Sequence, residues 1–297
     1  MNKAQLKVSA AFLSICSNAL LIILKLIVGF VIGSLSIISE ALHSLSDIAA
    51  SFIAFLSVKK SSEPADKEHP FGHGKFEELS GFFEGLLICG IAILIFYSAI
   101  MKVINDTPLE FEPFWGILIM SFSVVLNFFV SKYLFKVGRK TNSIAIIADA
   151  EHLKTDVVSS LAVLLGLVVI KVTGLVIIDV IFAFVVAVII MITGIKLTLT
   201  AIKGLVDEAL PQEDIDLLNE ILNSHKNKDI EEVKFLKTRK AGSEKIIELV
   251  ITVKRDMTII VGHEICNAIE NEIMTKLEGA KVFIHLEPAE NRSNVLN

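Results

Sequence analysis

The chain has 297 residues, of which 53% are hydrophobic and 21% are charged, and its formal net charge is −5. This composition is too apolar for a soluble domain, which averages about 45–50% apolar and about 25% charged residues, and it excludes disorder, which requires low hydrophobicity. The acidic balance argues against nucleic acid as a partner, because phosphate binding needs a basic face.

The charge divides sharply after Val206. Residues 1–206 carry a net charge of +1, whereas the much shorter segment 207–297 carries −6 with nearly as many charged side chains. The two segments are therefore expected to lie in different solvents. The division predicts a transmembrane domain over 1–206, a soluble domain over 207–290 and a tail over 291–297.

Six segments of the first part are long and apolar enough to cross a bilayer core of about 30 Å, which needs roughly 20 residues of helix. The first has no short apolar region with a small-residue cleavage site, so it is interpreted as a retained span and not as a signal peptide. The predicted spans cover residues 9–31, 35–58, 79–101, 114–135, 144–171 and 177–203.

The basic residues of the short loops predict the orientation, because an excess of Lys and Arg marks the cytoplasmic side. Most of these basic residues fall in loops on one side of the predicted membrane domain, whereas the loop segments on the opposite side have only Lys102 and Lys171. Both termini are therefore expected in the cytoplasm, as an even number of spans requires. The side with the excess carries Lys3, Lys7, Lys59, Lys60, Lys67, Lys75, Lys132, Lys136, Arg139, Lys140 and Lys203.

The segment after Asp207 predicts a small α+β domain of order α-β-β-α-β. Its amphipathic last helix has Ile265, Ile269 and Ile273 at helical spacing. The predicted elements are a helix at 212–224, strands at 231–238 and 245–254, a helix at 258–277 and a strand at 281–287. The three cysteines lie far apart and form no CxxC pair, which predicts no disulfide framework: Cys16, Cys89 and Cys266.

The second and fifth spans share a pattern of ionisable residues: an acid, Ala, any residue, His, two residues, Ser or Thr, and Asp. In the second span the pattern ends in His43 and Asp47, and in the fifth it ends in His152 and Asp156. Charges inside a membrane cost about 2.5–3.5 kcal/mol each on insertion scales, so such residues are functional candidates. This repeated pattern is the most informative feature of the sequence.

Residues four apart lie on one face of a helix, so each His–Asp pair forms a two-pronged clamp. The spans run antiparallel and the two pairs lie at similar depths, which lets the clamps meet near mid-membrane. Two imidazoles and two carboxylates suit tetrahedral Zn²⁺, whereas Mg²⁺ and Ca²⁺ prefer six or more oxygens. The alternative is that these side chains hydrogen-bond between helices and bind nothing.

Other polar residues of the spans have weaker claims. Glu40 and Asp149 lie on the same helix faces as the clamps and are interpreted as supporting or helix-contact groups. For four further residues, a packing or interfacial role is at least as good an interpretation as a metal role: Asn18, Lys25, Asn127 and Glu84. The sequence assigns no role to Glu84.

Two further clusters are candidates outside the membrane. The loop between the second and third spans offers Asp66, His69 and His73 within eight residues, with Pro and Gly between them, although exposed loop histidines are common. In the soluble domain, His263 opens the last helix, and His285 and Glu287 alternate on the last strand and share a face. Ordinary surface polarity is the alternative for these three.

These motifs resemble the cation diffusion facilitator family, proton-coupled exporters of divalent transition metals, over residues 5–289. The similarity rests on the His43/Asp47 segment, the stretch from His69 to Glu77, the segment from Ala148 to Asp156, and Leu205 to Pro211. The resemblance implies a six-helix membrane bundle, a cytoplasmic metallochaperone-like domain and a homodimer with one transport site in each protomer.

By the same resemblance, the transport site maps onto His43, Asp47, His152 and Asp156, and a loop site maps onto Asp66, His69 and His73. Lys75 and Asp207 match positions that form a charge interlock between protomers, and His263, His285 and Glu287 match metal positions of the cytoplasmic domain. Lys234 and Val250 stand where other ligand histidines are found, so the resemblance implies at most one weakly held ion there.

The predicted function is export of Zn²⁺ from the cytoplasm in exchange for protons, by alternating access in a bacterial inner membrane. Many bacterial members of the family have Asp at the position of His43, so the ligand set of this chain resembles that of zinc-selective members. An imidazole in place of a carboxylate disfavours Mn²⁺, which prefers oxygen ligands. Export of Fe²⁺, Cd²⁺, Co²⁺ or Mn²⁺ and a non-transporting metal sensor are the alternatives. A membrane metalloprotease is disfavoured because the HExxH motif is absent, and no enzymatic activity is expected.

Overall fold

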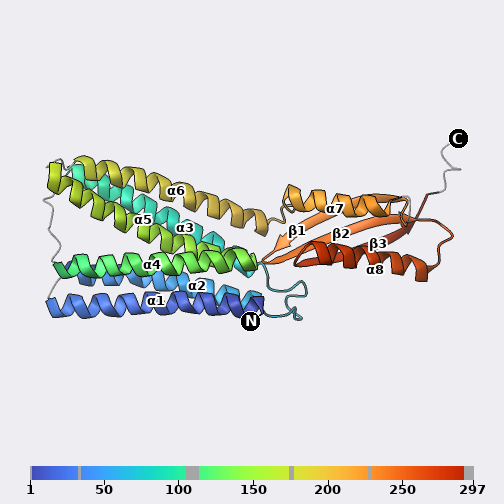
Figure 1. Cartoon of the computed structure of the whole chain (residues 1–297), viewed down its shortest axis with the longest axis horizontal. Coiled ribbons are helices and arrows are strands. Elements are labelled where there is room, and N and C mark those ends of the chain that lie inside the picture. Colours follow the sequence, from blue (N-terminus) through green and yellow to red (C-terminus); the bar gives the residue numbers. More distant parts are fainter. Residues whose placement is uncertain (1, 33–34, 105–113, 174–176, 227–228, 291–297) are drawn as a thin grey trace. The chain divides into compact units, whose positions relative to one another are not determined.

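The structure is a computed structural model that describes residues 2–32, 35–104, 114–173, 177–226 and 229–290, and for parts of the helices it describes only the backbone. The predicted tail at 291–297 lies outside the described residues. The chain divides into two compact units, the first ending at Ile202 and the second beginning at Lys203. Figure 1 shows long helices in the first unit and a mixture of helices and strands in the second.

The first unit is a bundle of long helices. Their bounds are α1 (Lys3–Ile32), α2 (Leu35–Ser61), α3 (Phe76–Ile104), α4 (Phe114–Thr141), α5 (Ile144–Thr173) and α6 (Ile177–Leu205). Each predicted span lies within one of these helices. α1 packs along α2 and α4, and α5 packs along α4, α3 and α2 (Figure 1).

Four helical segments are long and apolar enough to cross a membrane in the described part of the chain: Lys3–Val28, Phe76–Tyr97, Ile117–Thr141 and Phe184–Leu205. The expected spans in α2 and α5 are not confirmed by that criterion. The described side chains of α2 and α5 cover only parts of these two helices. Large apolar side chains are exposed on the bundle, among them Phe129 and Ile93, as lipid contact requires.

Small residues set the spacing between α3 and α6. A Cβ atom on Gly85 would lie 2.8 Å from the backbone nitrogen of Thr198, and one on Gly194 would lie 2.9 Å from the backbone nitrogen of Cys89. Neither backbone atom can move aside as a flexible side chain can. Glycine at these two positions therefore allows the two helices to approach closely.

We expect Gly85→Ala to destabilise the bundle by about 1–3 kcal/mol, because overpacking forces the backbones apart. Gly90→Ala on the same helix is the matched control, since a Cβ atom there would meet nothing within 4 Å. Thermal unfolding of the purified protein in detergent measures the difference. Equal midpoints for the two variants would contradict the close approach of α3 and α6.

The second unit has the predicted order α-β-β-α-β: α7 (Gln212–His225), β1 (Glu232–Ala241), β2 (Glu244–Val253), α8 (Ile259–Lys276) and β3 (Ala280–Pro288). β1 pairs antiparallel with β2, and β3 pairs parallel with β2 after the crossover through α8. Buried residues of α7, β2 and α8 form one apolar core, which includes Leu218, Ile247, Leu249, Ile251 and Ile269.

The cysteines agree with the expectation from their spacing. Cys16 is exposed, Cys89 is partly buried and Cys266 is buried, and all three are free thiols. No disulfide therefore links the described helices and strands.

Candidate metal centre

The second and fifth helices bring ionisable side chains together inside the bundle. One donor atom from each of Asp47, His152 and Asp156 lies within 4.8 Å of the other two. His152 and Asp156 are one turn apart on α5, and Asp47 approaches them from α2. The side chain of His43 lies outside the described residues, and its backbone lies one helical turn before Asp47.

The spacing of these atoms suits metal ligands better than a hydrogen bond. His152 Nε2 lies 3.5 Å from Asp47 Oδ1, beyond the usual N–H···O range of about 2.7–3.2 Å. Two ligands that are each about 2.0–2.2 Å from one tetrahedral ion are separated by about 3.3–3.6 Å. His152 is 2% exposed, and neither ring nitrogen has a hydrogen-bond partner in the described part of the chain.

A cavity of about 230 Å³ adjoins this cluster, and Asp47 and Asp156 both line it. A water molecule occupies about 30 Å³ of liquid, so the cavity has room for an ion and several waters. Its other polar lining residues are Asn18, Lys25, Ser44, Ser123, Asn127 and Ser160.

A hydrogen-bonded layer joins three helices next to the cluster. Asn18 of α1 donates to Ser51 of α2 at 2.9 Å, and Ser51 donates to Asp149 of α5 at 2.9 Å. Asp149 is fully buried, which supports its interpretation as a helix-contact group. Glu84 of α3, which the sequence could not place, is also fully buried and accepts a hydrogen bond from Ser80 at 2.8 Å.

The loop before α3 forms a second cluster. Asp66 Oδ1 lies 3.4 Å from His69 Nδ1, and Asp66 Oδ2 lies 3.3 Å from His73 Nε2. Gly72 has a φ of +89°, a conformation that favours glycine and lets the chain turn back. His73 is 2% exposed, and neither of its ring nitrogens has a hydrogen-bond partner in the described part of the chain.

The backbone amide of His69 donates to Asp66 at 2.6 Å and holds the pKa of that carboxyl below its ordinary value. Asp66 therefore stays ionised to lower pH and keeps its capacity to bind a cation. The donor set of one carboxylate and two imidazoles at these distances fits Zn²⁺ or a similar transition metal.

Comparisons with known proteins identify the family of the chain. Residues 11–206 match the cation efflux transmembrane domain, and residues 210–289 match the cytoplasmic domain of cation efflux proteins. The chain belongs to the cation diffusion facilitator family. As a member, it is a multi-pass membrane transporter for efflux of divalent cations and not an enzyme.

Relatives match over nearly the whole chain. An uncharacterized transporter of Synechocystis sp. is 34% identical, over 90% of this chain and 86% of its own. The cation-efflux pump FieF of Cronobacter sakazakii is 31% identical, over 94% and 92%. A solved structure titled as the zinc form of a putative zinc transporter, CzrB, is 30% identical and covers 29% of this chain and 97% of its own, with a TM-score of 0.27.

The three candidate ligands of the cytoplasmic domain, His263, His285 and Glu287, do not lie as close together as the ligands of the other two clusters. His285 Nε2 lies 3.6 Å from Glu287 Oε1, so these two share a face as expected. His263 is exposed on α8 and joins no group of three donors in the described residues. Lys234, at a bulge in β1, donates to Glu287 at 2.8 Å and holds the pKa of that carboxyl below its ordinary value.

We expect Lys234→Met to strengthen metal binding at His285 and Glu287, because it removes the ammonium that competes with a metal for the carboxylate. Zn²⁺ should then raise the unfolding midpoint of the purified chain by several degrees more than in the parent. Lys281→Met is the control, since Lys281 pairs with Glu244 elsewhere on the sheet. Equal Zn²⁺-dependent shifts in the two variants would show that Lys234 does not restrict this position.

The proposed interlock residues are each engaged in the single chain. Asp207 has a φ of 60° and accepts from Arg239 Nη1 at 3.2 Å. Lys75 precedes α3, and its carbonyl accepts from the amide of Leu79. Their pairing between protomers stays a prediction.

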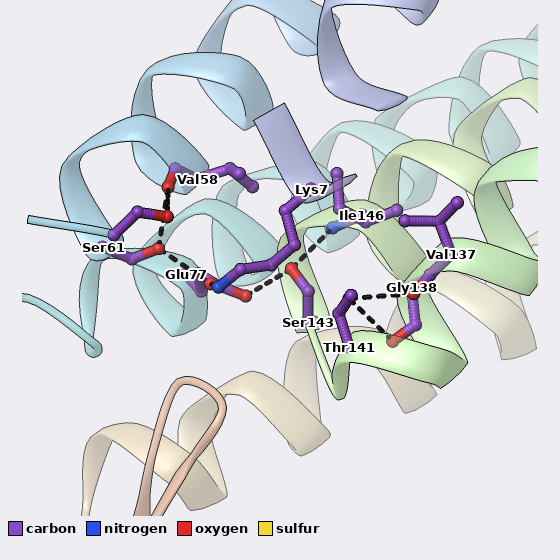
Figure 2. A network of polar contacts seen from close by, with 10 residues as sticks. Lys7, Val58, Ser61, Glu77, Val137, Gly138, Thr141, Ser143 and Ile146 are labelled. Carbon is purple, nitrogen blue, oxygen red and sulfur yellow. Dashed lines mark hydrogen bonds and ion pairs between the residues drawn. The ribbon is translucent and has the colours of Figure 1, made fainter. Parts of the chain in front are cut away.

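A buried ion pair lies at one end of the bundle, where the sequence placed Lys7 only among the basic residues of the cytoplasmic side. Lys7 Nζ lies 2.6 Å from Glu77 Oε1, and their side chains are 5% and 0% exposed. Figure 2 shows Ser61 and Ser143 also turned toward Glu77. This network joins α1, α2, α3 and the start of α5. Lys7 lies just outside the predicted span at 9–31, so no local feature of the sequence indicated its burial.

Proposed function

We propose that the chain exports Zn²⁺ from the cytoplasm in exchange for protons, by alternating access at His43, Asp47, His152 and Asp156. The observation that carries the proposal is the cluster of buried His152 with the partly buried Asp47 and Asp156, beside a cavity that both aspartates line. The 3.5 Å between His152 Nε2 and Asp47 Oδ1 matches the separation of two donors on one tetrahedral ion.

Proton coupling follows from the chemistry of these ligands. A metal binds only deprotonated imidazole and carboxylate, so protons and Zn²⁺ compete for the same groups. In the state open to the cytoplasm the site takes Zn²⁺, and in the state open to the opposite side protons displace it. The transporter then returns with protons bound.

We further propose a homodimer in the bacterial inner membrane with both termini in the cytoplasm. In this proposal Asp66, His69 and His73 hold a regulatory ion near the membrane domain, and Lys75 pairs with Asp207 of the other protomer. His263, His285 and Glu287 hold at most one weakly bound ion, because Lys234 forms an ion pair with Glu287.

Purified protein in liposomes with an encapsulated metal-sensitive dye tests the function. We expect an imposed pH gradient to drive Zn²⁺ faster than Cd²⁺, Fe²⁺, Co²⁺ or Mn²⁺. A different preferred ion would replace zinc within the same class of transporter. Metal-dependent change in the cytoplasmic domain without any flux would instead establish a sensor.

A further inference from the structure

A buried lysine lines the same cavity as the two aspartates of the proposed transport site. Lys25 of α1 is 5% exposed, and its Nζ donates to Ser44 Oγ at 2.8 Å. Ser44 is 6% exposed and lies on α2 between His43 and Asp47. Lys25, Ser44, Asp47 and Asp156 all line the cavity of about 230 Å³.

The charges around this cavity are unequal. Among its described lining residues, Asp47 and Asp156 are the acids and Lys25 is the base. With ionised side chains they sum to −1 without metal and +1 with a divalent ion. A neutral residue in place of Lys25 would make these sums −2 and 0. Lys25 therefore favours the metal-free site and opposes a bound divalent cation.

We propose that Lys25 is a resident counter-cation that weakens metal binding at this site and so speeds metal release. The inference rests on the proposed function for its role in transport, but its effect on binding does not require flux. The hydroxyl of Ser44 accepts a hydrogen bond from the ammonium and holds it at the wall of the cavity. Lys25 is thus a positioning and affinity-setting residue and not a metal ligand.

Lys25→Met tests the inference, because it keeps a similar length and removes the charge. The dissociation constant for Zn²⁺ is measured on the purified full chain, with His69 and His73 replaced by Ala to silence the loop cluster. We expect Zn²⁺ to bind about tenfold tighter or more, and the maximal flux in liposomes to fall together with KM. Lys25→Arg should restore the parent's affinity.

Lys154→Met is the matched control, since it removes a lysine of α5 that is 53% exposed and pairs with Glu151. Its affinity should equal the parent's. Unchanged or weaker binding in folded Lys25→Met protein would overturn the inference. If Lys25→Met does not fold, Lys25→Gln carries the test, because its amide keeps a donor toward Ser44 without the charge; an unchanged dissociation constant in it would also overturn the inference.

The two proposals fail separately. If the parent shows no proton-driven flux but Lys25→Met binds Zn²⁺ more tightly, the counter-cation stands and the transport proposal falls. If the parent exchanges Zn²⁺ for protons while Lys25→Met binds Zn²⁺ as the parent does, the transport proposal stands and the counter-cation falls.

Discussion

Asp156→Asn should reduce Zn²⁺ flux about 100-fold or more, and Asp47→Asn should do the same. Each change keeps the shape of the side chain but removes a charged donor from the cluster between α2 and α5. Loss of a group that merely supports a ligand costs about 10–100-fold, so loss of a ligand should cost at least as much. Flux into liposomes under a fixed pH gradient measures the effect.

Asp216→Asn is the control, because Asp216 lies on α7 in the cytoplasmic domain and accepts a hydrogen bond from Gln212 at the surface. Its flux should equal that of the parent. Near-normal flux in both Asp47→Asn and Asp156→Asn would show that transport does not use this cluster.

Glu77→Gln should lower the stability of the membrane domain by about 3–5 kcal/mol, because it leaves the buried ammonium of Lys7 without its counter-charge. The double variant Lys7→Met with Glu77→Gln should recover part of this loss, since no unpaired charge is then buried. Reversible unfolding in mixed detergent micelles measures the three free energies.

The Lys60–Glu63 pair is the control, with the same separation of 2.6 Å but side chains that are 38% and 47% exposed. Glu63→Gln should change the stability little, because water screens an exposed pair. A loss in Glu77→Gln no larger than in Glu63→Gln would contradict the importance of burial. Because the network joins α1, α2, α3 and α5, its loss should also disturb the positions of Asp47 and His152.

Local sequence patterns were sufficient for most of the secondary structure and for the pairing of Asp47 with His152. Apolar length predicted the long helices, and the repeated His and Asp spacing predicted two clamps that meet. The cytoplasmic α-β-β-α-β order also followed from local patterns, because turns and alternating apolar residues mark each element.

Contacts between distant segments were not predictable in the same way. Lys7 and Glu77 are 70 residues apart, and nothing near either residue indicates its partner. Lys25 was left open between a packing or interfacial role and a metal role, because hydropathy does not show which cavity a helix face lines. The bulge that brings Lys234 to Glu287 depends on strand register, which the sequence of β1 alone does not determine.

Proton release on Zn²⁺ binding tests the central claim most directly, since it asks whether metal and protons occupy the same groups. The measurement uses protein with His69→Ala and His73→Ala, so that the loop cluster does not bind the metal. Calorimetry in buffers of different ionisation enthalpy counts the protons released on Zn²⁺ binding. We predict that Zn²⁺ binding releases protons near pH 6, and that Asp156→Asn abolishes both the binding and the release. Zn²⁺ binding at this cluster without proton release would contradict the account.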